Sequence, residues 1–392
     1  MKIHTVNEGE TLSDVAKKYG VCESDLSEIN GIIGNKLSAG EEILILVPTR
    51  VHTSRYGDTL EKICMRYRVR INDILTLNPT IDKRKLEANK RIILKYDTRT
   101  HGMAVTNGCI YKGTTLNALE NVLPLMTYAT FASVMADQRG FHKIFDEECL
   151  LNTVKKESKV PILKIHDSWN ERYSNLGNVT EFCDDIIELA RKKGYKGILL
   201  NSTAHSCSAS DYISFMMNLK KRMIGSDLIL FTECDEKTPS GFNEIADGSI
   251  LSYTKLWNEK ICSFSEGEKK IISDFACDSE SIKSFIELPS FARLGDGFID
   301  IESAKRKARN KETNTVCDDE TLTASFDTGH KKCIYPTLKN VKAVLELMSE
   351  YGFMGICFDV MRTPSVFLSM YNAMFKTVNY TTSASREGCS RE

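Results

Sequence analysis

Six side chains that could support catalysis or metal binding stand just after apolar runs of the sequence. They are His166, Asp167, His205, Cys207, Glu233 and Asp235. A Cys–His pair could supply a nucleophile with its base, and a His, Asp and Cys group could hold a metal ion. Spacing on separate segments is weak evidence without geometry. We therefore interpret His205 and Cys207 as loop or helix-start residues. We expect Glu233 and Asp235 to face solvent, and we expect neither a metal nor a cofactor.

One apolar run ends without any charge. In the stretch "GYKGILLNST", the apolar residues Ile198–Leu200 are typical of a buried strand. They are followed by Asn201, Ser202 and Thr203. Many enzymes place acidic residues at the end of such a strand, where they can transfer protons. Amide and hydroxyl side chains do not ionise near neutral pH and cannot take that role.

A regular alternation of short apolar runs and amphipathic helical segments surrounds this stretch, from about residue 101 to 375. The runs are "GMAVTNGCI", "TYATFASV", "VPILKIH", "KGILLNS", "SDLILFTE", "GSILSYT", "SIKSFIEL" and "FMGICFDV". Eight strands alternating with helices predict a (β/α)8 TIM barrel over 100–378, whose active site would lie at the C-terminal ends of the strands. A charged stretch at about 297–336 predicts a small α+β insertion before the last strand.

The N-terminal part contains an internal repeat. "HTVNEGETLSDVAKKYGV" and "HTSRYGDTLEKICMRYRV" superimpose without a gap, and each copy predicts a small βααβ domain, over 1–48 and 51–97. Thr11 and Thr59 are suited to cap the helix that follows, because a hydroxyl can satisfy a free backbone N–H there. Leu12, Val15 and Tyr19 recur at helical spacing and predict one apolar face.

The two copies resemble LysM domains through Gly-acid-Thr-Leu before the first helix, Asn after the second, and "LSAG" or "LEAN" before the last strand. The resemblance implies binding of peptidoglycan or another N-acetylglucosamine polymer in a groove between two loops. The implied glycan-binding residues are Gly9, Glu10, Thr11, Leu12, Gly31, Ile32 and Ile33 in the first copy, and Gly57, Asp58, Thr59, Leu60, Pro79, Thr80 and Ile81 in the second. Two weak sites on one chain would gain by avidity on a polymer.

The barrel resembles family 18 glycoside hydrolases, of the LysM-bearing type known from bacterial spores as cortical-fragment lytic enzymes. In that family the fourth strand carries D-x-x-D-x-D-x-E, whose glutamate is the general acid while the substrate's acetamido oxygen is the nucleophile. The four acidic positions fall here on Lys196, Leu199, Asn201 and Thr203.

Two further family positions of the barrel cleft also depart from the pattern. Strand six keeps Tyr253 but has Thr254 where an acid is common, and strand eight ends in Asp359 where a Trp is usual. Departures on three strands together indicate that the glycosidase chemistry has been lost.

Composition limits the other functions. A net charge of −1 gives no broad attraction to nucleic acid, and no apolar stretch is long enough to span a membrane. The N-terminus lacks an apolar secretion signal. The 13 cysteines show no metal-type spacing, which indicates that the protein is made in a reducing compartment. Most of these cysteines are expected to be small, buried apolar residues. Cys389 lies in a polar C-terminal segment, 379–392, that we predict to be disordered.

These observations lead to one hypothesis with two alternatives. The chain is predicted to be a peptidoglycan-binding, spore-associated pseudoenzyme, made in the mother-cell cytosol and located in the coat or at the cortex boundary. The first alternative is an active N-acetylglucosaminidase that degrades cortex fragments during germination, with Glu233 as its acid. The second is a structural scaffold that docks spore-coat proteins.

Overall fold

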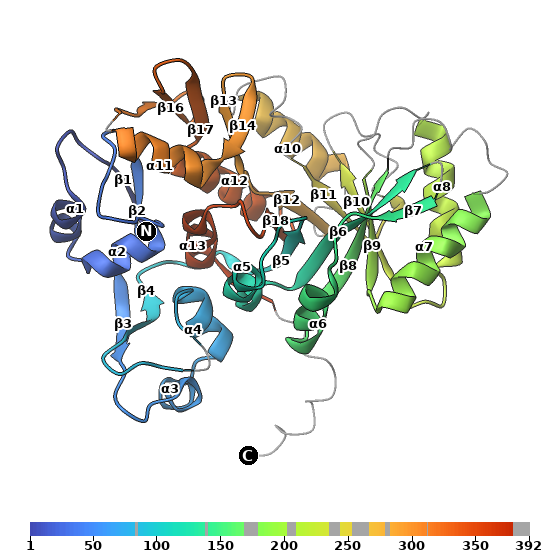
Figure 1. Cartoon of the computed structure of the whole chain (residues 1–392), viewed down its shortest axis with the longest axis horizontal. Coiled ribbons are helices and arrows are strands. Elements are labelled where there is room, and N and C mark those ends of the chain that lie inside the picture. Colours follow the sequence, from blue (N-terminus) through green and yellow to red (C-terminus); the bar gives the residue numbers. More distant parts are fainter. Residues whose placement is uncertain are drawn as a thin grey trace.

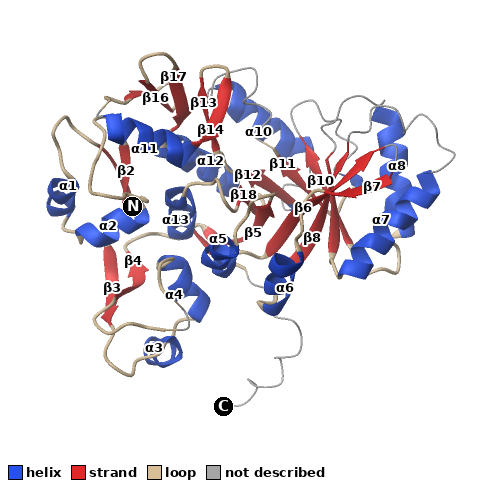
Figure 2. Cartoon of the chain, in the orientation of Figure 1, coloured by secondary structure: helices blue, strands red, loops and turns tan. Residues whose placement is uncertain are grey.

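The computed structural model describes residues 1–82, 85–137, 140–167, 179–201, 209–234, 244–252, 266–278, 283–311 and 313–378. Two small N-terminal domains lie side by side against a larger α/β domain (Figures 1 and 2). The predicted tail at 379–392, with Cys389, lies outside the described residues.

Each small domain has the predicted order of strand, helix, helix and strand. The first repeat domain consists of β1 (Lys2–Thr5), α1 (Leu12–Tyr19), α2 (Glu23–Ile29) and β2 (Glu42–Ile45). The second repeat domain consists of β3 (Pro48–Thr53), α3 (Leu60–Tyr67), α4 (Ile71–Leu77) and β4 (Arg91–Tyr96). In both, the two strands pair antiparallel, and the helices bury one apolar face against them.

Side-chain caps explain why these helices begin where they do. The hydroxyl of Thr11 accepts a hydrogen bond from the Asp14 backbone N–H at 3.2 Å, and the hydroxyl of Thr59 accepts one from Lys62 at 3.3 Å. Both threonines therefore satisfy a backbone donor that the first helical turn leaves free, as predicted.

Eight parallel strands close into the predicted barrel. In order around the barrel they are β5 (Gly102–Ile110), β6 (Tyr128–Asp137), β8 (Val160–Asp167), β9 (Gly197–Asn201), β10 (Ile229–Cys234), β11 (Gly248–Leu251), β12 (Ser284–Glu287) and β18 (Gly355–Asp359). β18 pairs with β5, and β5 with β6, which closes the sheet. β7 (Gly140–Lys143) extends the edge of β6 antiparallel, and β19 (Phe375–Thr377) runs parallel to the start of β5.

Helices alternate with these strands, as expected for a (β/α)8 barrel. They are α5 (Leu116–Val122), the 3₁₀ turn η1 (Leu123–Leu125), α6 (Glu148–Lys156), α7 (Val179–Lys193), α8 (Ala209–Arg222), α10 (Glu266–Asp278), α12 (Leu338–Glu350) and α13 (Ser365–Met374). Among the described residues, no helix combines the length and apolar character that a membrane crossing requires.

An α+β segment stands between β12 and α12. It comprises β13 (Phe291–Leu294), β14 (Gly297–Asp300), α11 (Ile301–Lys311), β15 (Val316–Asp318), β16 (Thr323–Asp327) and β17 (Lys332–Pro336). Its strands form a five-stranded antiparallel sheet. The sheet begins at Phe291, six positions before the predicted start of the insertion, because β13 pairs with both β14 and β17.

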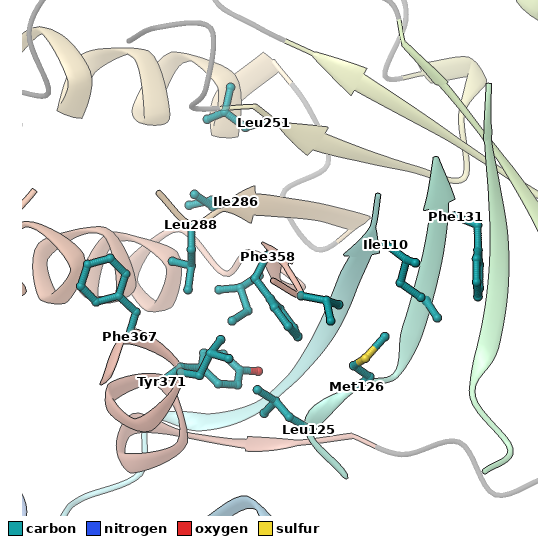
Figure 3. Packing of buried hydrophobic residues seen from close by; sticks show 14 of the residues in the cluster. Ile110, Leu125, Met126, Phe131, Leu251, Ile286, Leu288, Phe358, Phe367 and Tyr371 are labelled. Carbon is teal, nitrogen blue, oxygen red and sulfur yellow. The ribbon is translucent and has the colours of Figure 1, made fainter. Parts of the chain in front are cut away.

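The largest core lies outside the barrel wall, between the strands and the surrounding helices. Figure 3 shows Ile110 and Phe131 from the strands, Met126 beside them, and Phe367 and Tyr371 from α13 in this core. A second, smaller core fills the barrel interior. Its buried members are Val105, Cys109, Tyr128, Ile162, Leu199, Phe231, Ile250, Phe285 and Cys357. The barrel is thus packed by side chains over this part of its length.

Helix α13 connects the barrel to both repeat domains, since it contacts α2 of the first and α4 of the second (Figure 1). The repeat domains also contact each other, because Arg91 on β4 donates to the Asp25 carboxylate on α2 at 2.8 Å. The second helix of each repeat domain is therefore turned towards the rest of the molecule.

Candidate functional site

The first predicted glycan loop is held by the same three-residue arrangement in both repeat domains. His4 Nε2 lies 2.8 Å from a carboxylate oxygen of Glu10, and its Nδ1 lies 3.2 Å from the Tyr19 hydroxyl. In the second domain His52 lies 2.9 Å from Asp58 and 3.0 Å from the Tyr67 hydroxyl. Sequence reasoning missed these contacts, although both histidines and both tyrosines occupy matching positions of the repeat.

The two acidic side chains of this loop are anchored carboxylates. Partial burial opposes the ionisation of Glu10, but hydrogen bonds from the Asn7 backbone N–H and from His4 outweigh it and lower its pKa. Hydrogen bonds from the Arg55 backbone N–H and from His52 lower the pKa of Asp58. Both carboxylates therefore serve to shape the loop, and its outer surface is formed by exposed backbone at Gly9 and Gly57, where φ is +74° and +85°.

Four of the predicted glycan-binding side chains are core residues. Leu12 and Leu60 are 0% and 2% exposed, and Ile32 and Ile81 are also buried in the cores of their domains. Each packs against the apolar helix faces and strands of its small domain. The side chains of Leu12, Leu60 and Ile32 therefore have a structural role in place of the predicted direct contact, whereas Ile81 also lines a cleft beside the barrel.

The second predicted loop lies at an interface in both domains. A Cβ atom added to Gly31 would lie 3.2 Å from the Ser365 hydroxyl and 3.6 Å from the Glu302 carboxylate, so the barrel domain adjoins this loop. In the second domain, Thr80 donates to the Glu28 carboxylate on α2 at 2.7 Å. Pro79 is half-buried, whereas Ile33 is 85% exposed.

An exposed aromatic side chain adjoins the first loop of the second domain. Tyr56, directly before Gly57, is 100% exposed. A flat ring in this position can cover the apolar face of a sugar, as aromatic side chains do in many ligand sites. The prediction omitted it because the corresponding residue of the first copy is Glu8, so Tyr56 is not part of the repeated pattern.

The barrel positions that the sequence assigned to a lost catalytic motif lie at different levels of β9. Lys196 is exposed and precedes the strand, roughly 16 Å from its C-terminal end at about 3.3 Å per residue. Lys196 therefore lies away from the end of the strand at which the active site of such a barrel is expected. Leu199 is buried in the barrel interior, and Asn201 is half-buried at the C-terminal end of the strand. Thr203 lies outside the described residues.

A buried ion pair occupies the barrel centre beside these positions. Lys164 on β8 and Glu233 on β10 meet at 2.8 Å, and both are less than a tenth exposed. Glu233 is the partner of Asn201 in the register of β9 and β10, while Lys164 is the partner of Leu199. The ion pair therefore spans β9, with Lys164 on the neighbouring strand on one side and Glu233 on the neighbouring strand on the other. The prediction that Glu233 faces solvent is wrong, because its side chain is buried against Lys164.

The charge of Lys164 is stabilised by its surroundings. Burial of the ammonium disfavours its charge, but Glu233 and, more weakly, Glu287 outweigh this and raise the pKa of Lys164. The Ser252 hydroxyl donates to Glu287 at 2.7 Å. The Lys164 ammonium also lies 5.8 Å from the centre of the Tyr111 ring, and burial raises the pKa of that phenol. Sequence reasoning missed Lys164, although it is a charged residue at an inward position of an apolar strand.

Asp359 at the end of β18 organises a turn. Its carboxylate accepts from the backbone N–H groups of Met361 and Arg362, and it pairs with the Arg362 guanidinium at 3.0 Å. The guanidinium lies over the ring of Phe291, 5.3 Å from its centre. Tyr253 and Thr254, the other cleft positions considered, lie outside the described residues.

The alternative site built from His and Cys side chains falls largely outside the described part of the chain. His205, Cys207, Asp235 and the side chain of Asp167 lie outside the described part. His166 is the next-to-last residue of β8 and has a half-buried side chain. Among the residues that the structure describes, no three His, Cys, Asp or Glu side chains gather in a way that could hold a metal ion.

Comparison with known proteins agrees with both parts of this architecture. The LysM domain family model matches residues 4–45 and 52–95. No curated protein sequence matches the chain at a significant level. Many solved structures share the fold at low sequence identity, and three of them are described below.

The first two structures match nearly the whole chain. The spore cortex-lytic enzyme SleL of Bacillus megaterium QM B1551 is 14% identical, with a TM-score of 0.72, over 97% of this chain and 99% of that one. SleL of Bacillus cereus is 16% identical, also with a TM-score of 0.72, over 96% and 99%. A chitinase from Chromobacterium violaceum is 13% identical, with a TM-score of 0.59, over 69% and 98%. The chain therefore carries two LysM domains joined to a (β/α)8 barrel of the fold seen in SleL and in family 18 chitinases.

Proposed function

We propose that this chain is a peptidoglycan-binding, spore-associated protein whose barrel does not hydrolyse glycosidic bonds. The observation that carries the proposal is the Lys164–Glu233 ion pair, which bridges β9 where the family places its catalytic carboxylates. The two LysM domains supply the glycan-binding half of the proposal.

Proton supply is the chemical reason for expecting no hydrolysis. A general acid must hold a proton at the working pH and release it to the leaving oxygen. A carboxylate next to a buried ammonium is stabilised in its ionised form. Glu233 is in that position beside Lys164, and Asn201 supplies no carboxyl group.

The spore association rests on shape. The chain shares its domain order and fold with two SleL proteins, both described as spore cortex-lytic enzymes, along nearly its entire length. We propose a location in the spore coat or at the cortex boundary, with peptidoglycan as the main partner. Fractionation of sporulating cells tests this, and recovery mainly from vegetative cytosol or culture medium would contradict it.

The test of binding uses the full chain with insoluble spore peptidoglycan. We expect the protein to sediment with the polymer, and we expect Tyr56→Ala to weaken sedimentation. Met65→Ala is the matched control, because Met65 is also a large exposed apolar side chain, 73% exposed, but lies on α3. Failure of the unmodified chain to sediment would favour the scaffold alternative.

The test of catalysis measures products from reduced muropeptides and from chitooligosaccharides. We expect none, with an active family member as the positive control. Turnover that disappears in Glu233→Gln would overturn the proposal in favour of an active N-acetylglucosaminidase that uses Glu233 as its acid.

A further inference from the structure

A cleft of about 280 Å³ lies between the second repeat domain and the barrel. Its walls come from two parts of the chain that are separate in sequence. The repeat domain contributes Leu75, Asn78, Pro79, Thr80, Ile81 and Asp82, and the barrel contributes Asn117, Glu120, Asn121 and Pro124. The volume is close to the lower end of the range of roughly 300–1,000 Å³ typical of small-molecule sites.

We propose that this cleft binds one N-acetylated sugar of a glycan that also contacts the second repeat domain. The inference rests on the proposed glycan-binding function and extends the site beyond the repeat domain. The barrel would then take part in recognition through helix α5 even though it carries out no hydrolysis.

The barrel wall of the cleft offers free amide groups. Asn117 and Asn121 are four positions apart on α5, so they lie on one face of the helix. Both are exposed, and in the described part of the chain neither amide side chain has a hydrogen-bonding partner. An amide offers donors and an acceptor together, which matches the N–H and C=O of an acetamido group and the hydroxyls of a sugar ring.

The opposite wall supplies apolar surface and a fixed frame. Pro79 on this wall and Pro124 on the barrel wall line the cleft and can cover the C–H face of a sugar. The amide of Asn78 is already used, because it donates to the carbonyl oxygens of Ile74 and Ile93 and so holds the end of α4 on β4. The shape of the loop that follows α4 is therefore set before any ligand binds.

Two carboxylates line the cleft and one ammonium, that of Lys90, lies 3.5 Å from the Thr80 hydroxyl, so the balance of charge favours a neutral ligand over an anion. Asp82 and Glu120 both line it, and carboxylates disfavour the approach of a phosphate or another anion. An uncharged N-acetylglucosamine unit meets no such repulsion. This separates a glycan from the anionic ligands that a polar cleft could otherwise accept.

Direct contacts join the two walls of the cleft. α4 packs on η1, and the Asn372 amide of α13 donates to the carbonyl oxygen of Thr76 on α4 at 3.3 Å. On the other side, Thr80 is hydrogen-bonded to Glu28 of the first repeat domain. The loop Pro79–Asp82 thus lies where both repeat domains and the barrel meet, and a glycan held there would touch more than one of them.

The experiment measures the affinity of the full chain for chitopentaose, with and without Asn117→Ala and Asn121→Ala combined. Loss of two hydrogen bonds of ordinary strength predicts a Kd weaker by about tenfold. Asn152→Ala is the matched control, since Asn152 is an exposed helical asparagine on α6, away from the cleft. Alanine favours the helix at both sites, so loss of folding is not expected, and circular dichroism checks it.

A second readout locates the ligand directly. Chitopentaose should slow the hydrogen exchange of amides in 116–122 in the unmodified chain, and this protection should be lost in the double variant. If the unmodified chain binds but the double variant binds equally well and α5 gains no protection, the cleft proposal is wrong while the proposed function stands. If the unmodified chain does not bind chitopentaose or peptidoglycan, the proposed function itself fails.

Discussion

The guanidinium of Arg309 on α11 holds the carboxylate of Glu41, next to β2 of the first repeat domain, through two hydrogen bonds of 2.9 and 2.5 Å. Glu41 is 1% exposed, and the Lys305 ammonium lies 3.5 Å from the same carboxylate. Burial works against the ionisation of Glu41, but Lys305 and Arg309 outweigh it and lower its pKa. The first repeat domain is therefore docked on the insertion by a paired, buried charge.

Removing one partner of this pair should release the docking. Arg309→Met leaves the Glu41 carboxylate buried with a weaker partner, and breaking a buried ion pair in this way typically costs about 3–5 kcal/mol. We expect faster hydrogen exchange in 42–45 and a lower apparent melting temperature. Arg70→Ala is the control, because Arg70 and Asp73 form an exposed pair for which a loss of about 0.5 kcal/mol or less is typical.

Replacing both partners separates charge from packing. Arg309→Met combined with Glu41→Gln removes the buried carboxylate and leaves the Lys305 ammonium near Glu302, whose ionised form it also stabilises, so we expect part of the stability to return. A double variant as unstable as the single one would mean that shape, and not charge, holds the interface.

Gly40 should be required for docking but not for the fold of its own domain. It has a φ of +80°, and an added Cβ atom would lie 1.8 Å from the carbonyl oxygen of Thr315. The matching residue of the second repeat is Asn89, with a φ of +62° and an exposed side chain. Asparagine tolerates this backbone conformation, so the conformation alone does not demand glycine at position 40.

Gly40→Asn should therefore open the contact with 313–316 while the first repeat domain stays folded. Hydrogen exchange in these residues would increase, because Thr315 donates its backbone N–H to the carbonyl oxygen of Ala39 at 2.7 Å in the docked form. Asn89→Gly is the reciprocal control and should leave the docking unchanged. Equal exchange in Gly40→Asn and the unmodified chain would contradict the steric argument.

The barrel and the repeat domains could be predicted because their signals are local. The apolar run "GMAVTNGCI" coincides with β5, since parallel strands covered on both faces read as continuous apolar runs. The α1 pattern also predicted burial of Leu12, and this was confirmed. The family motif instead assigned Leu12 to the glycan site. Here the helical periodicity was the better guide, because it reports which face packs.

The polar contacts that define the site depend on residues far apart in the chain. Arg309 and Glu41 are 268 positions apart, and no periodicity links them. Lys164 and Glu233 come from strands on either side of β9. Their meeting depends on the closure of the barrel and on side-chain direction, which a pattern of residue types does not encode. For this reason the sequence predicted that Glu233 faces solvent, whereas it is buried against Lys164.

The first loops of the repeat domains should lose order in acid. Glu10 and Asp58 have pKa values below the ordinary 4.5 and 3.8, through hydrogen bonds made by their ionised forms. A lowered pKa in the folded state contributes stability that is present above the ordinary value and is lost as the pH falls through the lowered value. The contribution of both groups should be complete from about pH 5.5 upwards, which is roughly a unit above the higher of the two ordinary values, and it should disappear below the lowered pKa values.

Chitopentaose affinity measured from neutral pH into this acid range checks the prediction. In Glu10→Gln with Asp58→Asn, binding should be weaker at neutral pH and the acid loss should be reduced. Asp146→Asn serves as the control, because Lys143 on the barrel lowers the pKa of Asp146 far from the repeat domains. An acid profile that is unchanged in the double variant would contradict a role for these carboxylates.

Restoring the family carboxylates should not restore hydrolysis. We expect no product from muropeptides with Asn201→Asp combined with Thr203→Glu, although general acid catalysis alone is typically worth about 10²–10⁴-fold. The new Asp would pair in register with Glu233, so two carboxylates would compete for the single Lys164 ammonium, and one of them would have a raised pKa. Leu199 would still fill the position of a third acid.

Removing the competing charges makes this a sharper test. Adding Lys164→Met and Glu233→Gln to the two restored carboxylates eliminates the ion pair that bridges β9. If turnover then appears, the pair itself suppresses catalysis. If turnover stays absent, the loss also involves Leu199 and Asp359, whose carboxylate is committed to the turn at Arg362 and provides no aromatic floor for a sugar. Turnover in the variant that carries only the two restored carboxylates would contradict the prediction, because a general acid would then function beside an intact Lys164–Glu233 pair.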